Sequence, residues 1–276
     1  MGAERTLCPV ETVAIDVALP DGHARIHHRW WGKRDAGPVL VMLHEGLGSI
    51  AQWRSLPERL HTTTGLPILA YDRPGYGASR RCTADGERVP HVYAPDFMSI
   101  EATEVLPTLL RQLGVDDVIL VGHSDGGTIA LLAAAAIDNL GVPIRGVAVI
   151  AAHTHVEAVC VQGIRAAGLG RDRIIEGLGR YHDDPGATFD AWHDIWLSPD
   201  FASWSILEQL AQVTCPVLAL QGAHDEYATE SMLHGIGSGV SDPHVVELIP
   251  GCGHIAHRDQ PDIVLDRLNR FVTSIA

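Results

Sequence analysis

Residues 120–127 read Leu-Val-Gly-His-Ser-Asp-Gly-Gly, and this stretch decides the fold. It contains the nucleophile-elbow pattern Gly122-x-Ser124-x-Gly126, which alone is short enough to occur by chance. The apolar run 118–121 before it predicts a buried strand, and the alanine-rich run 128–137 after it predicts a helix. Strand and helix pass close together in such a turn, so the serine needs neighbours without Cβ atoms. The pattern predicts a hydroxyl held clear of a sheet at a helix N-terminus.

Continuous apolar runs alternate with helical patterns along much of the chain. Such runs are typical of strands buried on both faces, and their alternation with helices predicts a mostly parallel sheet with helices on both faces. The predicted buried strands are 39–43, 67–71, 118–121, 144–151, 216–220 and 245–249. The predicted helices are 51–61, 97–113, 128–137 and 262–271, of which 97–113 is expected to bend at Pro107 and to end at a Gly114 cap. Segments 10–18 and 24–31 predict two strands of a hairpin around Pro20-Asp21-Gly22.

The alternation stops at residues 153–208, which combine helical periodicity, many charges and several aromatic residues. This segment predicts a helical cap inserted into the core over one edge of the sheet. The predicted core domain therefore consists of residues 1–152 and 209–276. A chain of 276 residues with 46% apolar residues is long enough for one such α/β domain.

Composition excludes some classes of partner. The 20 Lys and Arg residues stand against 34 Asp and Glu residues, and a net charge of −14 disfavours nucleic acid. No run of 18 apolar residues predicts a membrane span, and the first residues lack the apolar core of a signal peptide. We therefore expect a cytoplasmic protein, with no membrane partner and reduced thiols; the oligomeric state is not indicated. The five scattered cysteines are Cys8, Cys82, Cys160, Cys215 and Cys252.

The sixteen histidines raise the question of a metal site. His153-x-His155 and His254-x-x-His257 are the pairs that a metal site would use. The chain has no HExxH motif and no Cys/His cluster with zinc spacing. We therefore expect no metal.

Polar residues follow two predicted strands, where an α/β sheet places its functional groups. Asp225 follows strand 216–220, and His254 follows strand 245–249. A serine hydroxyl needs a base to take its proton and a carboxylate to orient that base. Glu226 is the alternative carboxylate, and His257 is the alternative base.

The segments GHSDGG, GAHDE and GCGH occur in this order, each after an apolar strand. In these three segments, and over nearly its whole length, the chain resembles the α/β-hydrolase superfamily. The resemblance implies the α/β-hydrolase fold, with Ser124 as nucleophile, Asp225 as orienting acid and His254 as base. It implies no cofactor.

The resemblance also implies an oxyanion hole built from backbone N–H groups. One donor is the amide of Asp125, at a helix N-terminus, and the other is Gly46, with Leu47 as the alternative. The superfamily usually has His-Gly where this chain has His44-Glu45. The Glu45 side chain either contacts substrate or hydrogen-bonds its own loop, and the Asp125 side chain is expected to cap the following helix.

His44 is expected to brace its loop, and Asp72 and Arg73 to hydrogen-bond near the elbow. Trp192 and Trp196 are four residues apart, so they share one face of a predicted helix. They either line an apolar substrate pocket or attach the cap to the core. The expected pocket residues are Glu45, Leu47, His153, Trp192 and Trp196, with Trp53 and Val156 as further candidates.

These residues predict a serine hydrolase that cleaves a carboxylic ester or lactone of a small, largely apolar substrate through an acyl-enzyme on Ser124. A small molecule is the expected partner. Hydrolysis of a carbon–carbon bond in a β-diketone-like compound is the alternative reaction, and amidase or thioesterase chemistry uses the same groups. A receptor for small molecules without turnover is the alternative from another class. Serine at position 124 argues against dehalogenases and epoxide hydrolases, whose nucleophile is a carboxylate.

Overall fold

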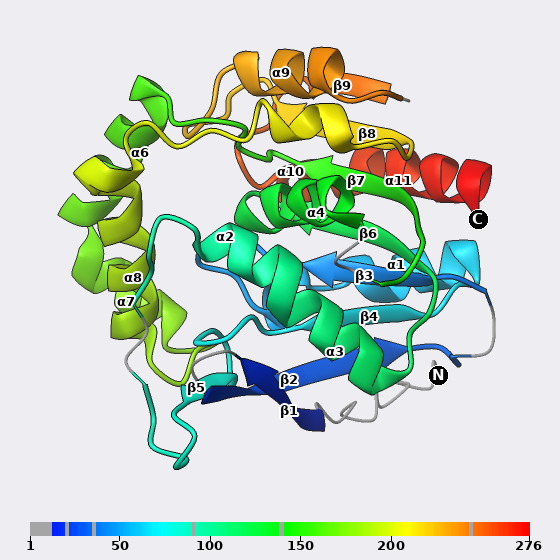
Figure 1. Ribbon diagram of the computed structural model, residues 1–276. Coiled ribbons are helices and arrows are strands. Elements are labelled where there is room, and N and C mark those ends of the chain that lie inside the picture. The colour runs from blue at the N-terminus through cyan, green and yellow to red at the C-terminus, as the bar shows by residue number, and fades with distance from the viewer. Residues whose placement is uncertain (1–12, 20–21, 35–36, 90–91, 138–140, 243–244) are drawn as a thin grey trace, which may run out of the picture.

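The computed structural model describes residues 13–19, 22–34, 37–89, 92–137, 141–242 and 245–276. Within these ranges, nine strands form one sheet in the order β1-β2-β4-β3-β6-β7-β8-β9, and β5 pairs with β2 (Figure 1). The strands from β4 to β9 along this order run parallel, and β1, β2 and β5 are antiparallel. The bounds are β1 Val13–Leu19, β2 Gly22–Trp31, β3 Val39–Leu43, β4 Ile68–Tyr71, β5 Arg80–Cys82, β6 Val118–His123, β7 Ile144–Ile150, β8 Val217–Gly222 and β9 Val245–Ile249.

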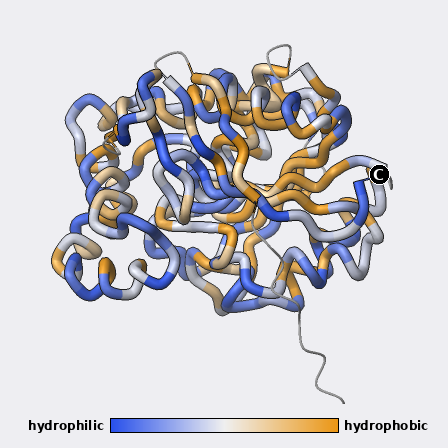
Figure 2. The backbone as a smooth tube through the Cα atoms, turned by 90° about the horizontal axis from the view of Figure 1, so that it is seen from below, coloured by the Kyte–Doolittle hydropathy of each residue, from blue (hydrophilic) through white to orange (hydrophobic). Residues whose placement is uncertain are grey.

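Two hydrophobic cores lie on opposite faces of this sheet. Val39, Val41 and Leu43 of β3 enter one core, and Leu40 and Met42 enter the other, because strand side chains alternate. Helices α2 (Phe97–Ile100), α3 (Leu106–Leu113) and α4 (Asp125–Ala135) pack on the first face, and α1 (Leu56–Thr64) and α11 (Pro261–Ile275) pack on the second. Figure 2 shows hydrophobic stretches along the sheet and hydrophilic stretches mainly around it. The predicted fold class, a mostly parallel sheet with helices on both faces, is confirmed.

The helices differ in detail from the sequence prediction. Segment 51–61 is a 3-10 turn, Ile50–Trp53, followed by a separate helix. Segment 97–113 is interrupted by the π-helical turn Glu101–Val105, and Gly114 ends it with a φ of 67°. The elbow helix begins at Asp125, three residues before the predicted start. The helices are α1 Leu56–Thr64, α2 Phe97–Ile100, α3 Leu106–Leu113, α4 Asp125–Ala135, α6 Ala158–Leu169, α7 Arg171–Leu178, α8 Pro185–Leu197, α9 Ser231–Gly239, α10 Ala256–Asp259 and α11 Pro261–Ile275.

Part of the predicted hairpin, residues 10–12 and 20–21, lies outside the described residues, as does Cys8. Residues 13–19 pair antiparallel with residues 22–28, as the hairpin prediction requires. None of the helices in the described ranges has the length and apolarity to cross a membrane.

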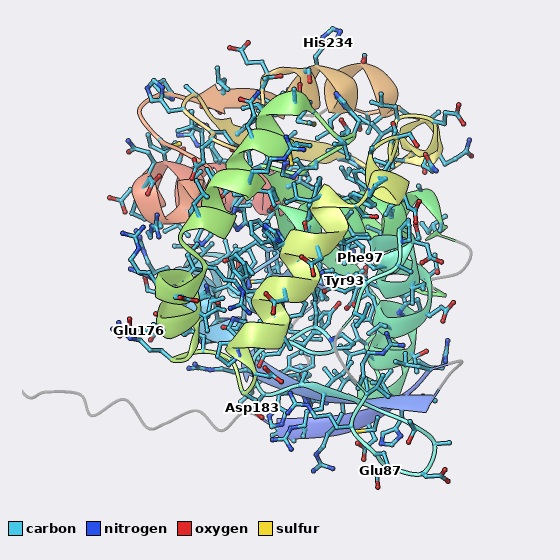
Figure 3. All side chains as sticks on the ribbon, turned by 90° about the vertical axis from the view of Figure 1, so that its left-hand side faces the viewer. Glu87, Tyr93, Phe97, Glu176, Asp183 and His234 are labelled. Carbon is cyan, nitrogen blue, oxygen red and sulfur yellow. The ribbon has the colours of Figure 1, made fainter. Side chains whose placement is uncertain are left out.

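Helices α6, α7 and α8 follow β7 and lie together on one side of the sheet (Figure 1). Helix α8 starts where the Asp184 carboxylate accepts a hydrogen bond from Ala187 N at 3.1 Å, with Pro185 in the first turn. Figure 3 shows these helices from outside, with Tyr93 and Phe97 beside them. These two rings stack at 4.0 Å. The helices form the insertion expected at 153–208, although its limits as a domain stay a prediction.

Candidate active site

Ser124 stands in a strained turn between β6 and α4. Its φ of 52° and ψ of −121° are rarely adopted by a residue with a side chain. The turn is tight because Gly122 packs against the backbone of Gly126, and Gly126 packs against Leu43 O; a Cβ at either glycine would overlap these atoms. Ser124 N donates a hydrogen bond to Ile150 O at 2.8 Å, which fixes the turn to β7. The elbow glycines are therefore required by close packing.

Ser124, His254 and Asp225 lie in one hydrogen-bonded row. The distance from Ser124 Oγ to His254 Nε2 is 2.9 Å. His254 Nδ1 lies 2.9 and 3.0 Å from the two carboxylate oxygens of Asp225. The Asp225 side chain is fully buried and also accepts a hydrogen bond from Tyr227 N at 2.9 Å. This geometry suits a serine activated by a histidine whose tautomer a carboxylate fixes.

The two alternative residues have other contacts. The Glu226 carboxylate accepts a hydrogen bond from the backbone N of His254 at 3.1 Å. Glu226 therefore contacts the backbone of His254 and not its ring. His257 is buried, and its ring lies 5.0 Å from the ring of Trp53. Burial, followed by the charge of His123, lowers the pKa of His257 to about 3. The structure thus joins Asp225 and His254 to Ser124, and joins neither Glu226 nor His257 to it.

The surroundings of His254 and Asp225 shift the pKa values of both side chains. Burial alone would lower the pKa of His254, but the hydrogen bond and charge of Asp225 outweigh it and raise that pKa above 6.5. Burial would raise the pKa of Asp225, but its hydrogen bond to His254 lowers it below the ordinary value. An ionised Asp225 therefore favours a proton on His254, which is the charge that a base acquires during catalysis.

His44 braces the loop that follows β3. Its Nδ1 donates to Glu45 O at 2.8 Å, and its Nε2 accepts from Arg73 N at 2.9 Å. Arg73 Nη2 also donates to Glu45 O at 3.1 Å. The bracing role predicted for His44 agrees with these contacts.

His182, from the insertion, holds the same loop from the other side. Its Nε2 donates to Leu47 O at 3.2 Å, and its Nδ1 accepts from Gly77 N at 2.9 Å. Burial lowers the pKa of His182, which keeps the ring neutral and able to accept. Sequence patterns gave no signal for this contact, because it joins residues 135 positions apart.

Gly46 lies directly beneath the insertion. A Cβ at this position would overlap the ring of Trp192 and approach Asp125 Oδ2 to 3.0 Å. Gly46, Leu47, Asp125 and Ser124 line the same cavity. The loop is thus adjacent to the nucleophile, and the backbone donors at Gly46 and Asp125 stay a prediction.

The Asp125 side chain does not cap the helix by a hydrogen bond. Its carboxylate lies 3.6 Å from Arg73 Nη2, and both side chains are 1% exposed. No hydrogen-bond partner for its oxygens lies among the described residues. Asp72, in contrast, accepts hydrogen bonds from Ile50 N at 2.7 Å and Ala78 N at 3.2 Å, in keeping with a structural role. The prediction for the Asp125 side chain was wrong because a buried cation lies close enough to pair with it.

A cavity of about 370 Å³ opens beside Ser124. All five predicted pocket residues line it, namely Glu45, Leu47, His153, Trp192 and Trp196. Trp53 does not line it: the indole is 2% exposed and packs in the core between α1 and the sheet. Val156 is also outside its lining. Lining residues that sequence reasoning missed are Gln52, Cys160, Ile164, Ile174, Leu178, Glu226, Tyr227, Ile255 and Arg258.

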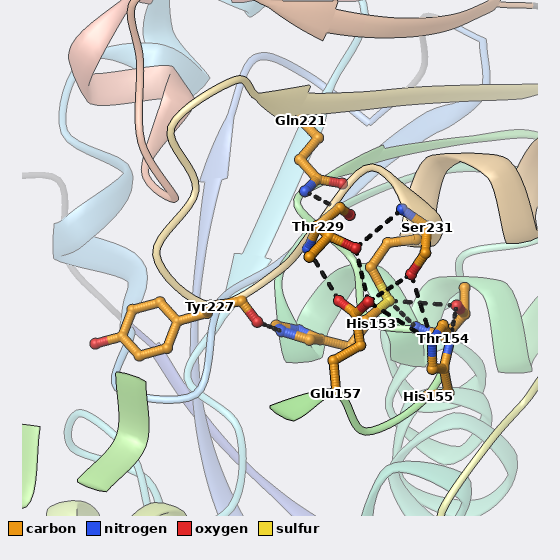
Figure 4. A network of polar contacts seen from close by, with 9 residues as sticks. His153, Thr154, His155, Glu157, Gln221, Tyr227, Thr229 and Ser231 are labelled. Carbon is orange, nitrogen blue, oxygen red and sulfur yellow. Dashed lines mark hydrogen bonds and ion pairs between the residues drawn. The ribbon is translucent and has the colours of Figure 1, made fainter. Parts of the chain in front are cut away.

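The loop that carries Asp225 is tied to the start of the insertion (Figure 4). The Glu157 carboxylate accepts from Thr229 N at 2.9 Å, from Thr229 Oγ1 at 2.6 Å and from Ser231 Oγ at 2.7 Å. His153 Nε2 lies 3.3 Å from Tyr227 O on the same loop. These contacts hold the loop that follows Asp225, starting at Tyr227.

His155 contributes to this network as well. Its Nδ1 lies 3.0 Å from Thr154 Oγ1, and its Nε2 lies 3.4 Å from Ser231 Oγ. Within the described ranges, no three His, Cys, Asp or Glu residues are grouped as a metal site requires. The histidine pairs noted in the sequence have protein contacts instead.

The chain belongs to the alpha/beta hydrolase family, whose family model matches residues 40–267. It is 35% identical over 97 residues to the sn-1-specific diacylglycerol lipase ABHD11 of Mus musculus, a match covering 35% of this chain but only 28% of that relative. It is 23% identical over 266 residues to a 2-(acetamidomethylene)succinate hydrolase of Mesorhizobium japonicum, covering 87% of this chain and 90% of that protein. A thermophilic esterase from Thermogutta terrifontis superimposes with a TM-score of 0.72 at 18% identity, covering 96% of this chain and 99% of the other, which shows a shared fold.

Proposed function

We propose that this protein is a serine hydrolase that cleaves a carboxylic ester or lactone of a small, largely apolar substrate. The row Ser124–His254–Asp225, with contacts of 2.9 to 3.0 Å, carries the proposal. Membership of the alpha/beta hydrolase family supports it, as do relatives named as lipase and esterase.

The proposed reaction has two halves. Ser124 Oγ attacks the carbonyl carbon while His254 Nε2 takes the hydroxyl proton, and the oxyanion accepts hydrogen bonds from the N–H groups of Gly46 and Asp125. Collapse of this intermediate breaks the ester C–O bond, and His254 returns the proton to the leaving alcohol. Water then attacks the acyl-enzyme with the same base and restores Ser124.

The cavity limits the size and polarity of the substrate. Cap helices contribute its apolar wall, made by Cys160, Ile164, Ile174, Leu178, Trp192 and Trp196. Gln52, Glu226 and Arg258 contribute polar groups to its lining. A volume of about 370 Å³ fits a short acyl chain or a small ring, and aromatic walls favour apolar groups.

Turnover of a series of p-nitrophenyl esters and a panel of lactones tests the proposal. The wild type is compared with Ser124→Ala, and labelling by an organophosphonate is measured in both. We expect serine-dependent turnover with a preference for short acyl groups, and labelling of wild type only. Labelling without turnover of any ester or lactone would contradict the proposed substrate class, and absence of both would contradict the nucleophile.

A further inference from the structure

The N–H edge of the Trp192 indole lies against the loop that follows β3. A Cβ built on Gly46 would meet Cδ1 and Nε1 of this ring, with Nε1 2.6 Å away. The same Cβ would lie 3.0 Å from Asp125 Oδ2. Gly46 and Asp125 are the residues whose backbone N–H groups form the proposed oxyanion hole. The indole N–H is therefore close to the place where negative charge develops in the proposed reaction.

This N–H has no acceptor among the described residues. The side-chain contacts of Trp192 there are with aromatic rings, Phe189 at 5.8 Å and Tyr227 at 6.2 Å. The indole is 8% exposed and lines the cavity beside Ser124. Because an indole nitrogen only donates, it is available to an acceptor on a molecule bound in the cavity.

The neighbouring indoles of the insertion differ from Trp192 in this respect. Trp196 also lines the cavity, but its Nε1 is enclosed by the protein and has no partner among the described residues. Trp204 stacks on Phe201 at 5.0 Å and does not belong to the lining. Of the two tryptophans in the described lining, Trp192 is thus the one whose N–H can reach a substrate.

The glycine at position 46 points to the same contact. The φ of Gly46 is not positive, so its backbone conformation is open to any residue. A side chain at this position would instead meet the Trp192 indole and the Asp125 carboxylate. The close approach of the indole, and not the shape of the loop, therefore requires glycine here.

We propose that the Trp192 N–H is a third donor to the oxyanion, supplied by the side chain of a cap helix beside the backbone N–H groups of Gly46 and Asp125. This inference rests on the proposed hydrolase function. A hydrogen bond to a charged oxygen is stronger than one to a neutral carbonyl oxygen, so the donor stabilises the transition state more than the bound substrate. Trp192 is then a catalytic residue, and α8 completes the site as well as covering it.

The charges around the oxyanion site make a further donor useful. The carboxylates of Glu45 and Asp125 both belong to residues that line the cavity, and a negative charge nearby opposes an oxyanion. Arg73 Nη2 lies 3.6 Å from Asp125 Oδ2, but this side chain is 1% exposed and is not part of the lining. The Trp192 N–H, in contrast, reaches the cavity.

NMR of the ¹⁵N-tryptophan-labelled enzyme tests the contact directly. In the adduct of Ser124 with an organophosphonate, a phosphonyl oxygen takes the position of the oxyanion. We expect one indole N–H resonance, absent from Trp192→Phe, to move downfield on labelling and to exchange more slowly with water. The resonances of Trp196 and Trp204 serve as internal references and should not move. A Trp192 resonance that stays in place in the labelled enzyme would overturn the proposal.

Kinetics of Trp192→Phe test the catalytic consequence, because this variant loses the N–H and keeps an aromatic wall. We expect kcat to fall about tenfold with little change in KM, since the lost interaction belongs to the transition state. Trp204→Phe makes the same change outside the lining and should keep the kcat of the wild type, and thermal unfolding checks that both variants fold. A higher KM at unchanged kcat would show that Trp192 is only a wall of the pocket, which would overturn the proposal.

The two measurements separate this proposal from the proposed function. If Ser124 is labelled but no ester or lactone is cleaved, the hydrolase proposal fails, and the NMR result still decides the role of Trp192. Absence of labelling would overturn both.

Discussion

In the proposed mechanism, protonation of His254 controls activity. The pKa of His254 is raised above 6.5, mainly by its bond to the Asp225 carboxylate, and the protonated ring cannot take the serine proton. We therefore expect kcat/KM to rise with pH through a midpoint above 6.5. A pH profile with a fast-reacting ester measures it.

Asp225→Asn provides the matched comparison, because it removes the charge and keeps the shape. The midpoint should move down, and kcat should fall by about 10³-fold or more through loss of the required tautomer. A midpoint that stays in place would show that Asp225 does not set the pKa of His254.

Ser124 and His254 act as one unit, so either alanine substitution should lower kcat by several orders of magnitude. His257→Ala should not, because His257 packs on Trp53 and makes no contact with Ser124. Steady-state kinetics on the three variants decide this. If kcat fell as far in His257→Ala as in His254→Ala, the assignment of His254 as the general base would be wrong.

The three residues of the row could be predicted from sequence because each follows a strongly apolar strand, where chain order and sheet geometry leave few choices. The neighbour of Glu45 could not, because His123, whose Nδ1 lies 3.3 Å from Glu45 Oε2, is 78 positions away and its alignment depends on how β3 and β6 pair. Trp53 was misplaced because an aromatic ring near the loop after β3 suits a pocket wall and a core equally well, and the indole packs in the core between α1 and the sheet.

Between elements, the close approach of Gly46 to Trp192 joins the loop after β3 to α8. In Gly46→Ala the new Cβ would push the indole out of the cavity wall. We expect kcat/KM to fall at least about tenfold, because both the wall and the donor loop shift. Gly177→Ala, at a helical glycine with open space around it, is the control and should leave kcat/KM unchanged.

Glu157 connects the start of the insertion to the loop carrying Asp225. Glu157→Ala removes the acceptor of three hydrogen bonds from Thr229 and Ser231. Because these donors are exposed or half-buried and water can reach them, we expect a cost of about 0.5–1.5 kcal/mol in unfolding free energy. We also expect kcat to fall with KM nearly constant, because the acid is less well held. Thermal unfolding and kinetics measure both effects.

Glu230→Gln, at an exposed position next to Ser231, is the control for that variant. Loss of stability without any change in kcat would mean that the network supports the fold and does not position the acid.

Element types along the sheet were predictable, since buried parallel strands carry unbroken apolar runs. The π-helical turn at 101–105 was not, because it depends on packing around the buried Glu101 and not on local pattern. The contacts of His182 in the insertion were also unpredictable, because they join residues 105 and 135 positions apart.

Considered as a whole, the molecule buries carboxyl groups that stay partly protonated. Burial raises the pKa of Glu101 to about 7 from an ordinary value of 4.5. The folded state therefore holds a proton that the unfolded state has lost between these values, so this group's contribution to stability is complete below about pH 4.5 and is lost as pH rises to about 7.

Glu101→Gln removes this titration and keeps an acceptor for Tyr71 Oη, which lies 3.1 Å from Glu101 Oε1. Relative to wild type, the variant should gain stability as pH rises from about 5 to 8, by up to about 3 kcal/mol. Denaturant unfolding at both pH values measures this, with the exposed Glu87→Gln as control. A difference that does not change with pH would contradict a buried, titrating Glu101.

The neutral rings of His44 and His182 have a consequence for exposure to acid. Their pKa values are lowered by burial, whereas that of His254 is raised. On acidification the base therefore takes its proton first, while both braces of the loop still accept from their backbone partners. Between these two ranges of pH we expect the proposed activity to be lost while the loop keeps its contacts, so activity should return when the acid is neutralised. Stronger acid should also protonate His44 and His182 and release the loop, and assays at neutral pH after brief exposure to each acidic pH would detect this as incomplete recovery of activity.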